Sequence, residues 1–134
     1  MIDESLTYHN YPIQMNFTLH DANHHTLATL PAAGIAIRTP QDALDLIGNA
    51  GYQGACGVVL QAAQLAPAFF DLRTGLAGEV LQKFSNYDMR LAIVGDFAGY
   101  PSQALQDFIR ESNRQGRVCF LGSEAEAWAA LTRG

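Results

Sequence analysis

An acid, a base and a hydroxyl lie within four positions of the chain, at Asp71, Arg73 and Thr74, just ahead of an amphipathic stretch. We expect Thr74 to stand at the start of a helix, where unpaired N–H groups and the helix dipole stabilise a phosphate. Arg73 could then pair with that phosphate. A second, local interpretation gives Thr74 a purely structural role. Threonine is a preferred N-cap, and its hydroxyl oxygen then accepts a hydrogen bond from the backbone N–H two or three residues further along the chain. With Gly75, this turn is the first candidate for a binding site or a phosphoacceptor.

Four polar residues follow expected strands or open expected helices, and they form a second candidate site. In parallel α/β sheets, ligands favour the carboxyl ends of the strands. The residues expected at that edge are Thr39, Gln61, Asp96 and Ser123. Asp96 and Asp71 are also the carboxylates that a small hydrolase would need for acid–base chemistry. The local alternative for Asp96 is a turn aspartate that accepts from its own backbone.

The sequence favours a binding or regulatory module over an enzyme. No nucleophile, base and orienting residue are spaced in a recognisable catalytic motif, and no GxGxxG or GxxxxGK phosphate loop is present. His20, His24 and His25 lie in or beside an expected hairpin, without the spacing and further ligands of a metal site. We therefore expect neither a metal nor a cofactor, and we keep a hydrolase as the alternative.

Composition indicates a single globular domain that does not bind nucleic acid. The chain has 134 residues, of which 49% are hydrophobic and 16% charged, and its net charge is −5. This size and composition suit one packed core, and the negative charge would repel a phosphate backbone. No apolar run reaches the roughly 18 residues of a membrane helix, and residues 1–14 lack the pattern of a signal peptide. We expect a cytoplasmic protein that does not contact a membrane.

Residues 1–14 are polar and aperiodic, and we expect them to form a flexible extension before a single domain at 15–134. Within that domain, two alternating runs between residues 15 and 30 predict a hairpin. Further strands are predicted at 35–38, 56–60, 89–94 and 118–121, and helices at 40–51, 76–86 and 101–113 and after Ser123. This alternation predicts an α/β fold with a mainly parallel sheet of about five strands and four helices.

The helix after Gly75 has the clearest period in the chain. Leu76, Val80 and Phe84 share one face, which we expect to pack on the sheet. Substitutions on this face should unfold the protein before they alter its function.

Three long runs carry a resemblance to a known family. They are FFDLRTGLAGEVLQKFSNY, RLAIVGDF and LQDFIRESNRQGRV. These runs resemble an uncharacterised bacterial family, domain of unknown function 4180, and the resemblance extends from about Met15 to Leu131. It implies no activity, because that family has none assigned.

A more distant resemblance is to the sulfate transporter and anti-sigma factor antagonist domains, called STAS domains. Their second major helix is preceded by Asp, any residue, Ser or Thr, Gly and an aliphatic residue, and a partner kinase phosphorylates the hydroxyl. The resemblance implies that Thr74, Gly75 and Leu76 fill the last three positions and Asp71 the first, although two residues separate Asp71 from Thr74 here. It also implies strands in sequential order, which puts Cys56 and Cys119 on strands two apart, too distant for a disulfide.

Together these features favour a STAS-like module that binds a protein partner, itself or a small anionic ligand near the start of the Thr74 helix. A third possibility is a structural subunit of a homodimer. In that case exposed Phe69, Phe70 or Tyr100 would be buried between two copies.

Overall fold

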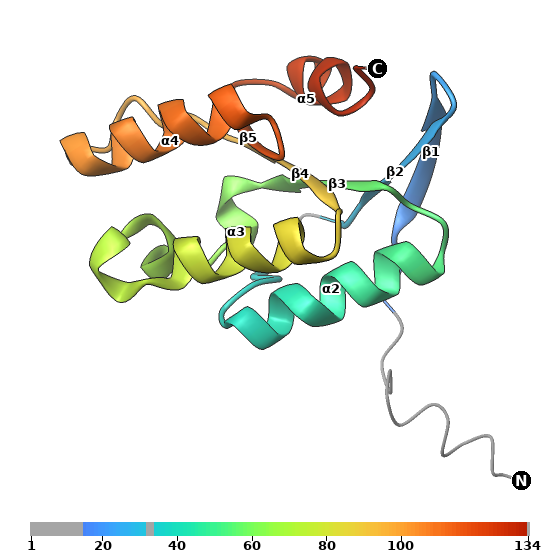
Figure 1. Cartoon of the computed structure of the whole chain (residues 1–134), viewed down its shortest axis with the longest axis horizontal. Coiled ribbons are helices and arrows are strands. Elements are labelled where there is room, and N and C mark those ends of the chain that lie inside the picture. The colour runs from blue at the N-terminus through green and yellow to red at the C-terminus, as the bar shows by residue number, and fades with distance from the viewer. Residues whose placement is uncertain (1–14, 32–33, 134) are drawn as a thin grey trace, which may run out of the picture.

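The computed structural model describes residues 15–31 and 34–133, so the expected flexible extension at 1–14 lies outside the described residues. Within these ranges, a five-stranded sheet and four α-helices make up the fold (Figure 1). The strands are β1 (Thr18–Ala22), β2 (His25–Thr29), β3 (Gly57–Gln61), β4 (Arg90–Val94) and β5 (Val118–Leu121). The α-helices are α2 (Pro40–Tyr52), α3 (Leu76–Asn86), α4 (Gln103–Gln115) and α5 (Glu124–Leu131). Short 3-10 turns cover Ala62–Gln64, Pro67–Phe70 and Leu72–Thr74.

The strands lie in the order in which they occur along the chain, from β1 to β5. β1 pairs with β2 in antiparallel fashion, and all other neighbours are parallel. The expected α/β class, the five strands, the four helices and the N-terminal hairpin are therefore confirmed. Asn23 and His24 have φ values of 51° and 66°, as a two-residue hairpin turn of type I′ requires.

The strands β3, β4 and β5 are buried on both faces of the sheet, and each face has its own apolar cluster. The larger cluster joins alternate strand residues such as Val58, Leu91 and Ile93 to α2, α3 and α4. The other face packs on α5, and its cluster is made by Leu27, Val59, Ala92, Val94, Ala127 and Leu131. In Figure 1, α5 lies on the side of the sheet opposite to α2 and α3. Strands covered in this way need near-continuous apolar runs, which β3, β4 and β5 have.

The strand expected at 35–38 is not formed. Only Ile37 makes an isolated bridge, to Leu65. The N–H groups of Ala36 and Ile37 donate to the Gln64 carbonyl oxygen at 2.7 and 3.2 Å, which ties the segment to the loop after β3. Since Thr39 must act as the N-cap of α2, too few residues remain for a paired strand.

The N-cap of α3 is not Thr74, the residue that the sequence suggested. Gly75, with φ of 80°, occupies the N-cap position, and Thr74 ends the preceding 3-10 turn. The expected apolar face of α3 is confirmed, because Leu76, Val80 and Phe84 are all buried.

Cys56 and Cys119 are both free thiols. Cys56 directly precedes β3 and Cys119 lies within β5, and β4 stands between these strands. Burial raises the pKa of the Cys119 thiol, which makes this sulfur less reactive. No helix formed by residues 15–31 or 34–133 combines the length and hydropathy of a bilayer-spanning segment.

The free edge of β5 is closed by side chains of α4 and α5. Asn113 accepts from the Phe120 N–H at 2.6 Å and donates to the Phe120 carbonyl at 3.1 Å. The Ser112 hydroxyl donates to the Val118 carbonyl, and the Gly122 N–H donates to Glu126 at 3.1 Å. The outward backbone groups of this edge therefore already have hydrogen-bond partners within the chain. An edge strand protected in this way does not pair with other chains.

Candidate functional site

The turn at 71–75 is held by a close pairing of Asp71 with Arg73. The Arg73 guanidinium donates from Nε to Oδ1 of Asp71 at 3.0 Å and from a terminal nitrogen to Oδ2 at 2.9 Å. The Arg73 backbone N–H adds a third bond, to Oδ1 at 3.2 Å. The Arg73 side chain is 90% exposed and that of Asp71 41%. Two parallel bonds of this kind fix orientation as well as charge, so Arg73 lies over Asp71 and presents its outer side to solvent.

This pairing shifts the titration of both groups. Hydrogen bonds from the Arg73 side chain and backbone hold the pKa of Asp71 below its ordinary value. The same carboxylate raises the pKa of Arg73. Asp71 is therefore an anion at neutral pH, and a carboxyl with a lowered pKa is a poor proton donor or acceptor there.

The shift gives an expected pH dependence. The pKa of an ordinary aspartate is roughly 3.9. The ion pair of Asp71 with Arg73 therefore contributes its full stabilisation of the folded turn above that pH, and the stabilisation is lost as the pH falls through the lowered pKa of Asp71. We expect Arg73→Gln to return the pKa of Asp71 towards its ordinary value. The carboxyl-carbon chemical shift of Asp71, followed by NMR against pH, measures this.

A second pair on α4 provides the control. Hydrogen bonds from Arg114 and Gln115 lower the pKa of Glu111 to about 2. Arg114→Gln should raise the pKa of Glu111 and leave that of Asp71 unchanged. If Asp71 of the unmodified protein titrates at its ordinary pKa, the pairing with Arg73 does not persist in solution.

The Thr74 hydroxyl is used within the turn. Its oxygen lies 2.7 Å from the Ala68 carbonyl oxygen and 2.9 Å from that of Asp71, so its proton is shared between two acceptors. The same oxygen accepts from the Leu76 N–H at 3.2 Å, which is the backbone contact that the local interpretation predicted. Thr74 itself is exposed. Its hydroxyl therefore ties two 3-10 turns to the first turn of α3 at the surface.

The first turn of α3 is a bare surface beside Thr74. Gly75 and Gly78 are both exposed. A Cβ added at Gly78 would meet nothing within 4 Å, so the fold does not require glycine at that position. A glycine within a helix lowers the stability of the helix by about 1 kcal/mol relative to alanine. Its presence leaves room for another molecule to approach the α3 backbone.

An aromatic cluster lies directly beneath this turn, where the carboxyl ends of the strands meet. Phe69 packs on Phe70 with ring centroids 5.0 Å apart, and Phe70 stacks on Tyr100 at 5.1 Å. The Phe97 and Phe120 rings meet edge-on at 5.4 Å. Phe69 and Phe70 are 0% and 8% exposed, so the expectation that they are free to form a dimer interface is wrong. They point inward because Pro67 opens a 3-10 turn that carries both rings into the core.

The four residues of the second candidate site have local roles in the structure. Thr39 forms the capping box of α2 with Asp42, and Ser123 caps α5. Asp96 accepts from the Ala98 N–H at 3.2 Å, which is the turn geometry of the local interpretation. The Gln61 side chain reaches Glu124 at 3.5 Å. A hollow near the end of β2 is lined by none of the four; its lining is Leu30, Pro31, Gly34, Ile35, Ala36 and Gln64.

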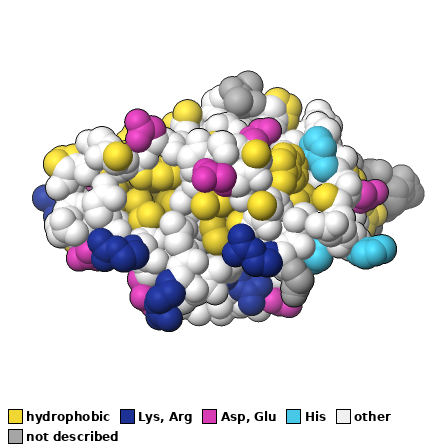
Figure 2. Space-filling model, turned by 90° about the horizontal axis from the view of Figure 1, so that it is seen from above, with side chains coloured by type: hydrophobic (Ala, Val, Ile, Leu, Met, Phe, Trp, Pro, Cys, Tyr) yellow, Lys and Arg dark blue, Asp and Glu magenta, His cyan; other side chains and the backbone are white. Residues whose placement is uncertain are grey.

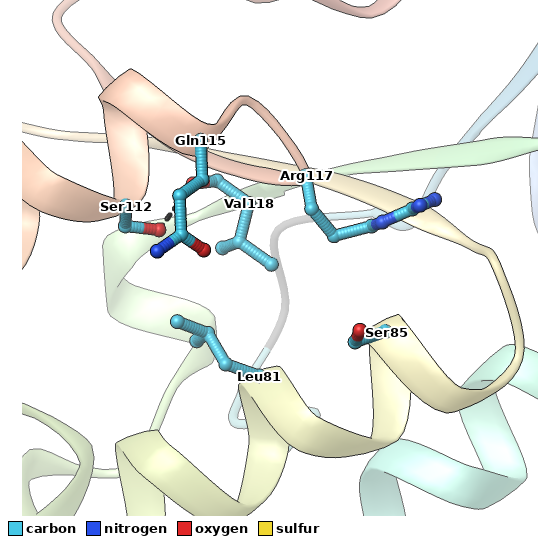
Figure 3. Close-up of a pocket in the computed structure, with 6 residues that line it drawn as sticks. All are labelled: Leu81, Ser85, Ser112, Gln115, Arg117 and Val118. Atoms are coloured by element: carbon cyan, nitrogen blue, oxygen red, sulfur yellow. Dashed lines mark hydrogen bonds between the residues drawn. The ribbon is translucent and has the colours of Figure 1, made fainter.

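A small hollow of about 60 Å³ lies between α3 and α4, beside the first residue of β5 (Figure 3). Leu81 and Ser85 line it from α3, and it is closed by Ser112, Gln115, Arg117 and Val118. Figure 3 shows the Arg117 side chain extending away from the other residues, and that side chain pairs with Asp88 at 2.6 Å. Ligand pockets usually enclose several hundred Å³ (roughly). This hollow by itself is smaller than that, and it adjoins a shallow hollow of about 450 Å³ that shares Ser85, Gln115 and Arg117.

Arg90 has a structural role that the sequence analysis missed. Its guanidinium donates to the carbonyl oxygens of Ala130, Leu131 and Gly116 at 3.0, 3.1 and 3.2 Å. These contacts neutralise the C-terminal end of α5 and hold it on the sheet. The signal available in the sequence was a lone arginine at the start of an otherwise apolar strand.

The histidines of the hairpin do not form a metal cluster. Within residues 15–31 and 34–133, no group of three or more His, Cys, Asp or Glu side chains is arranged to hold a metal ion. His20 packs on Trp128 with ring centroids 4.9 Å apart, and His25 lies 2.8 Å from the Asn23 carbonyl oxygen. The contact of His20 docks the hairpin against α5, whereas that of His25 lies within the hairpin turn.

Comparison with known proteins gives one match. Neither a curated protein nor a solved structure matches this chain. A family model matches residues 22–131, which include all five strands in whole or in part and all four α-helices. The chain therefore belongs to the family described as Domain of unknown function (DUF4180).

Proposed function

We propose that this chain is a non-enzymatic cytoplasmic binding or regulatory module with a STAS-like arrangement. Its contact surface is the exposed turn from Asp71 to Gly75 together with the first turn of α3. A protein partner, or a small anionic ligand held by Arg73 and the helix start, would bind there. Sequential strand order and a hydroxyl one residue before the α3 N-cap both agree with this proposal.

One observation carries the preference for binding over catalysis. Aromatic side chains occupy the space beneath the strand ends, where a parallel α/β protein would otherwise hold a substrate. Close packing of the backbone supports this, because a Cβ at Gly95 would lie 2.7 Å from Cβ of Ala62. A hydrolase using Asp71 and Asp96 is less well supported, since both carboxylates already serve as local hydrogen-bond acceptors.

Phosphorylation of Thr74 would have a defined local effect. The phosphate replaces the hydroxyl proton that is shared by the Ala68 and Asp71 carbonyls. It also places a charge of about −1.5 to −2 beside the Asp71 carboxylate and the Arg73 guanidinium. Arg73 could then exchange one anion for the other. The turn would change shape while the buried face of α3 stays in place, which is the behaviour expected of a switch.

Gly78→Gln tests the surface directly. We expect this variant to fold, because the position is open and glutamine is a better helix former than glycine. Recovery of partner proteins from cell extract, using the full chain as bait, should fall at least about fivefold, which corresponds to about 1 kcal/mol. Quantitative mass spectrometry of the bound proteins measures the loss. Ser85→Gln, two turns further along the exposed side of α3, is the matched control and should retain the partners.

Phosphorylation of Thr74 is tested by incubating the protein in the same extract with added ATP. A phosphate found at Thr74 by mass spectrometry, together with weaker partner recovery for Thr74→Glu, would support the switch. If Thr74 stays unmodified and neither Thr74→Ala nor Gly78→Gln alters recovery, the turn is not the contact surface.

A further inference from the structure

We infer that β1 is a pairing edge for a second copy of this chain, so that two sheets join through antiparallel β1 strands around a two-fold axis. This surface is separate from the turn at Thr74. The inference rests on the backbone groups of β1, on the exposed side chain at its centre and on the contrast with the opposite edge of the sheet.

The backbone of β1 directs alternate hydrogen-bonding groups away from the sheet. The Thr26 carbonyl accepts from the Cys56 N–H at 2.9 Å, so Thr26 faces β3. Its partner in the hairpin register is Asp21. In an antiparallel pair, residues that are not bonded to each other both face outward. Asp21, and Leu19 two residues earlier, therefore present N–H and carbonyl groups to solvent.

The two edges of the sheet are treated differently. At β5, Asn113 satisfies both backbone groups of Phe120, and Ser112 satisfies the Val118 carbonyl. At β1, among the described residues, no side chain occupies the outward groups of Leu19 and Asp21. β1 also lacks proline and lysine, two residues with which proteins block such edges. The protected edge shows that this fold can close an edge, and the described residues leave β1 open.

The exposed leucine of β1 favours a register centred on Leu19. Leu19 is 43% exposed, and placing it opposite its copy buries both leucines on the face that carries α2. The same register sets Thr18 opposite His20 of the other copy, and Phe17 opposite Asp21. A register centred on Asp21 would set the two Asp21 carboxylates opposite each other, and like charges directly opposite are unfavourable. The leucine-centred register is thus self-complementary, as a two-fold interface must be.

The hairpin also has room for a neighbour. It lies at one end of the molecule in Figure 1, and Figure 2 shows histidine side chains at the corresponding end of the surface. All five residues of β1 are exposed or half-buried. A short strand pairing buries less than a standard interface of about 1,600 Å². We therefore expect a weak dimer, with a dissociation constant on the order of 10–100 µM.

Sedimentation of the full chain over a range of concentrations tests the inference. Leu19→Pro removes an outward N–H without removing a bond to β2, and Leu19→Lys adds an edge charge. Both should raise the dissociation constant at least tenfold (roughly). Tyr52→Lys is the matched control, because it replaces another exposed large side chain, 81% exposed and at the end of α2, by lysine. It should leave the constant unchanged.

Amide exchange identifies the edge itself. In the expected register, the N–H groups of Leu19 and Asp21 bond to the second copy, so their exchange should slow as the protein concentration rises. If Leu19→Pro does not fold, Leu19→Lys alone decides. A protein that stays monomeric up to about 1 mM, or a dimer that both Leu19 variants leave intact, would overturn the inference.

Discussion

Replacing Phe69 by alanine is expected to lower the free energy of unfolding by about 3–5 kcal/mol. This side chain is 0% exposed, and its ring packs against those of Phe70 and Phe120. The loss combines the burial of the ring with the cavity that it leaves. Because a small domain is stable by only about 5–15 kcal/mol, the variant should unfold at much lower urea concentration. Urea denaturation followed by circular dichroism measures the change.

A matched control separates the cluster from general effects of aromatic removal. Tyr52 is 81% exposed, and Tyr52→Ala should change the free energy of unfolding by less than about 0.5 kcal/mol. Phe69→Leu keeps much of the buried volume and should fall between the two. A Phe69→Ala protein as stable as Tyr52→Ala would mean that the aromatic cluster is not packed in solution.

Arg90→Met is expected to cost about 3 kcal/mol, because it removes the charged donor that three backbone carbonyls share. The three carbonyls are those of Gly116, Ala130 and Leu131. Their loss should release α5 from the sheet before the rest of the domain unfolds. The chain has a single tryptophan, Trp128 in α5, and its fluorescence reports this release directly.

Arg90→Lys is the informative companion variant. It keeps the positive charge near the end of α5 but not the planar fork that reaches several carbonyls at once. We expect it to recover less than half of the lost stability. Full recovery by lysine would show that charge near the helix end, and not the set of hydrogen bonds, holds α5 in place.

Local patterns in the sequence predicted most of the fold. The hairpin, the apolar strands and the helix face of Leu76, Val80 and Phe84 follow from periodicity, and the capping box at Thr39 follows from residue types. These features depend on neighbours in the chain. The strand at 35–38 was predicted wrongly because its apolar residues pack under a loop, and a local pattern does not distinguish that from strand pairing.

The candidate site was predictable only in part. The contact of Thr74 with the backbone of Leu76 follows from residue type, and so does the turn at Asp96. The inward direction of Phe69 and Phe70 does not, because it depends on Phe97, Tyr100 and Phe120, which come from later elements. Likewise, the role of Arg90 depends on α5, about 40 residues further along the chain.

The sequential strand order has a consequence for how the protein is made. Every strand pairs with the one synthesised just before it, so the sheet can grow in step with translation and requires no later strand to be inserted between earlier ones. The face carrying Leu27, Val59 and Ala92 is different, because among residues 15–31 and 34–133 α5 is the helix that covers it. We expect that apolar face to lack the cover of α5 until residues 124–131 have left the ribosome, so the nascent chain should be most prone to aggregate before α5 docks.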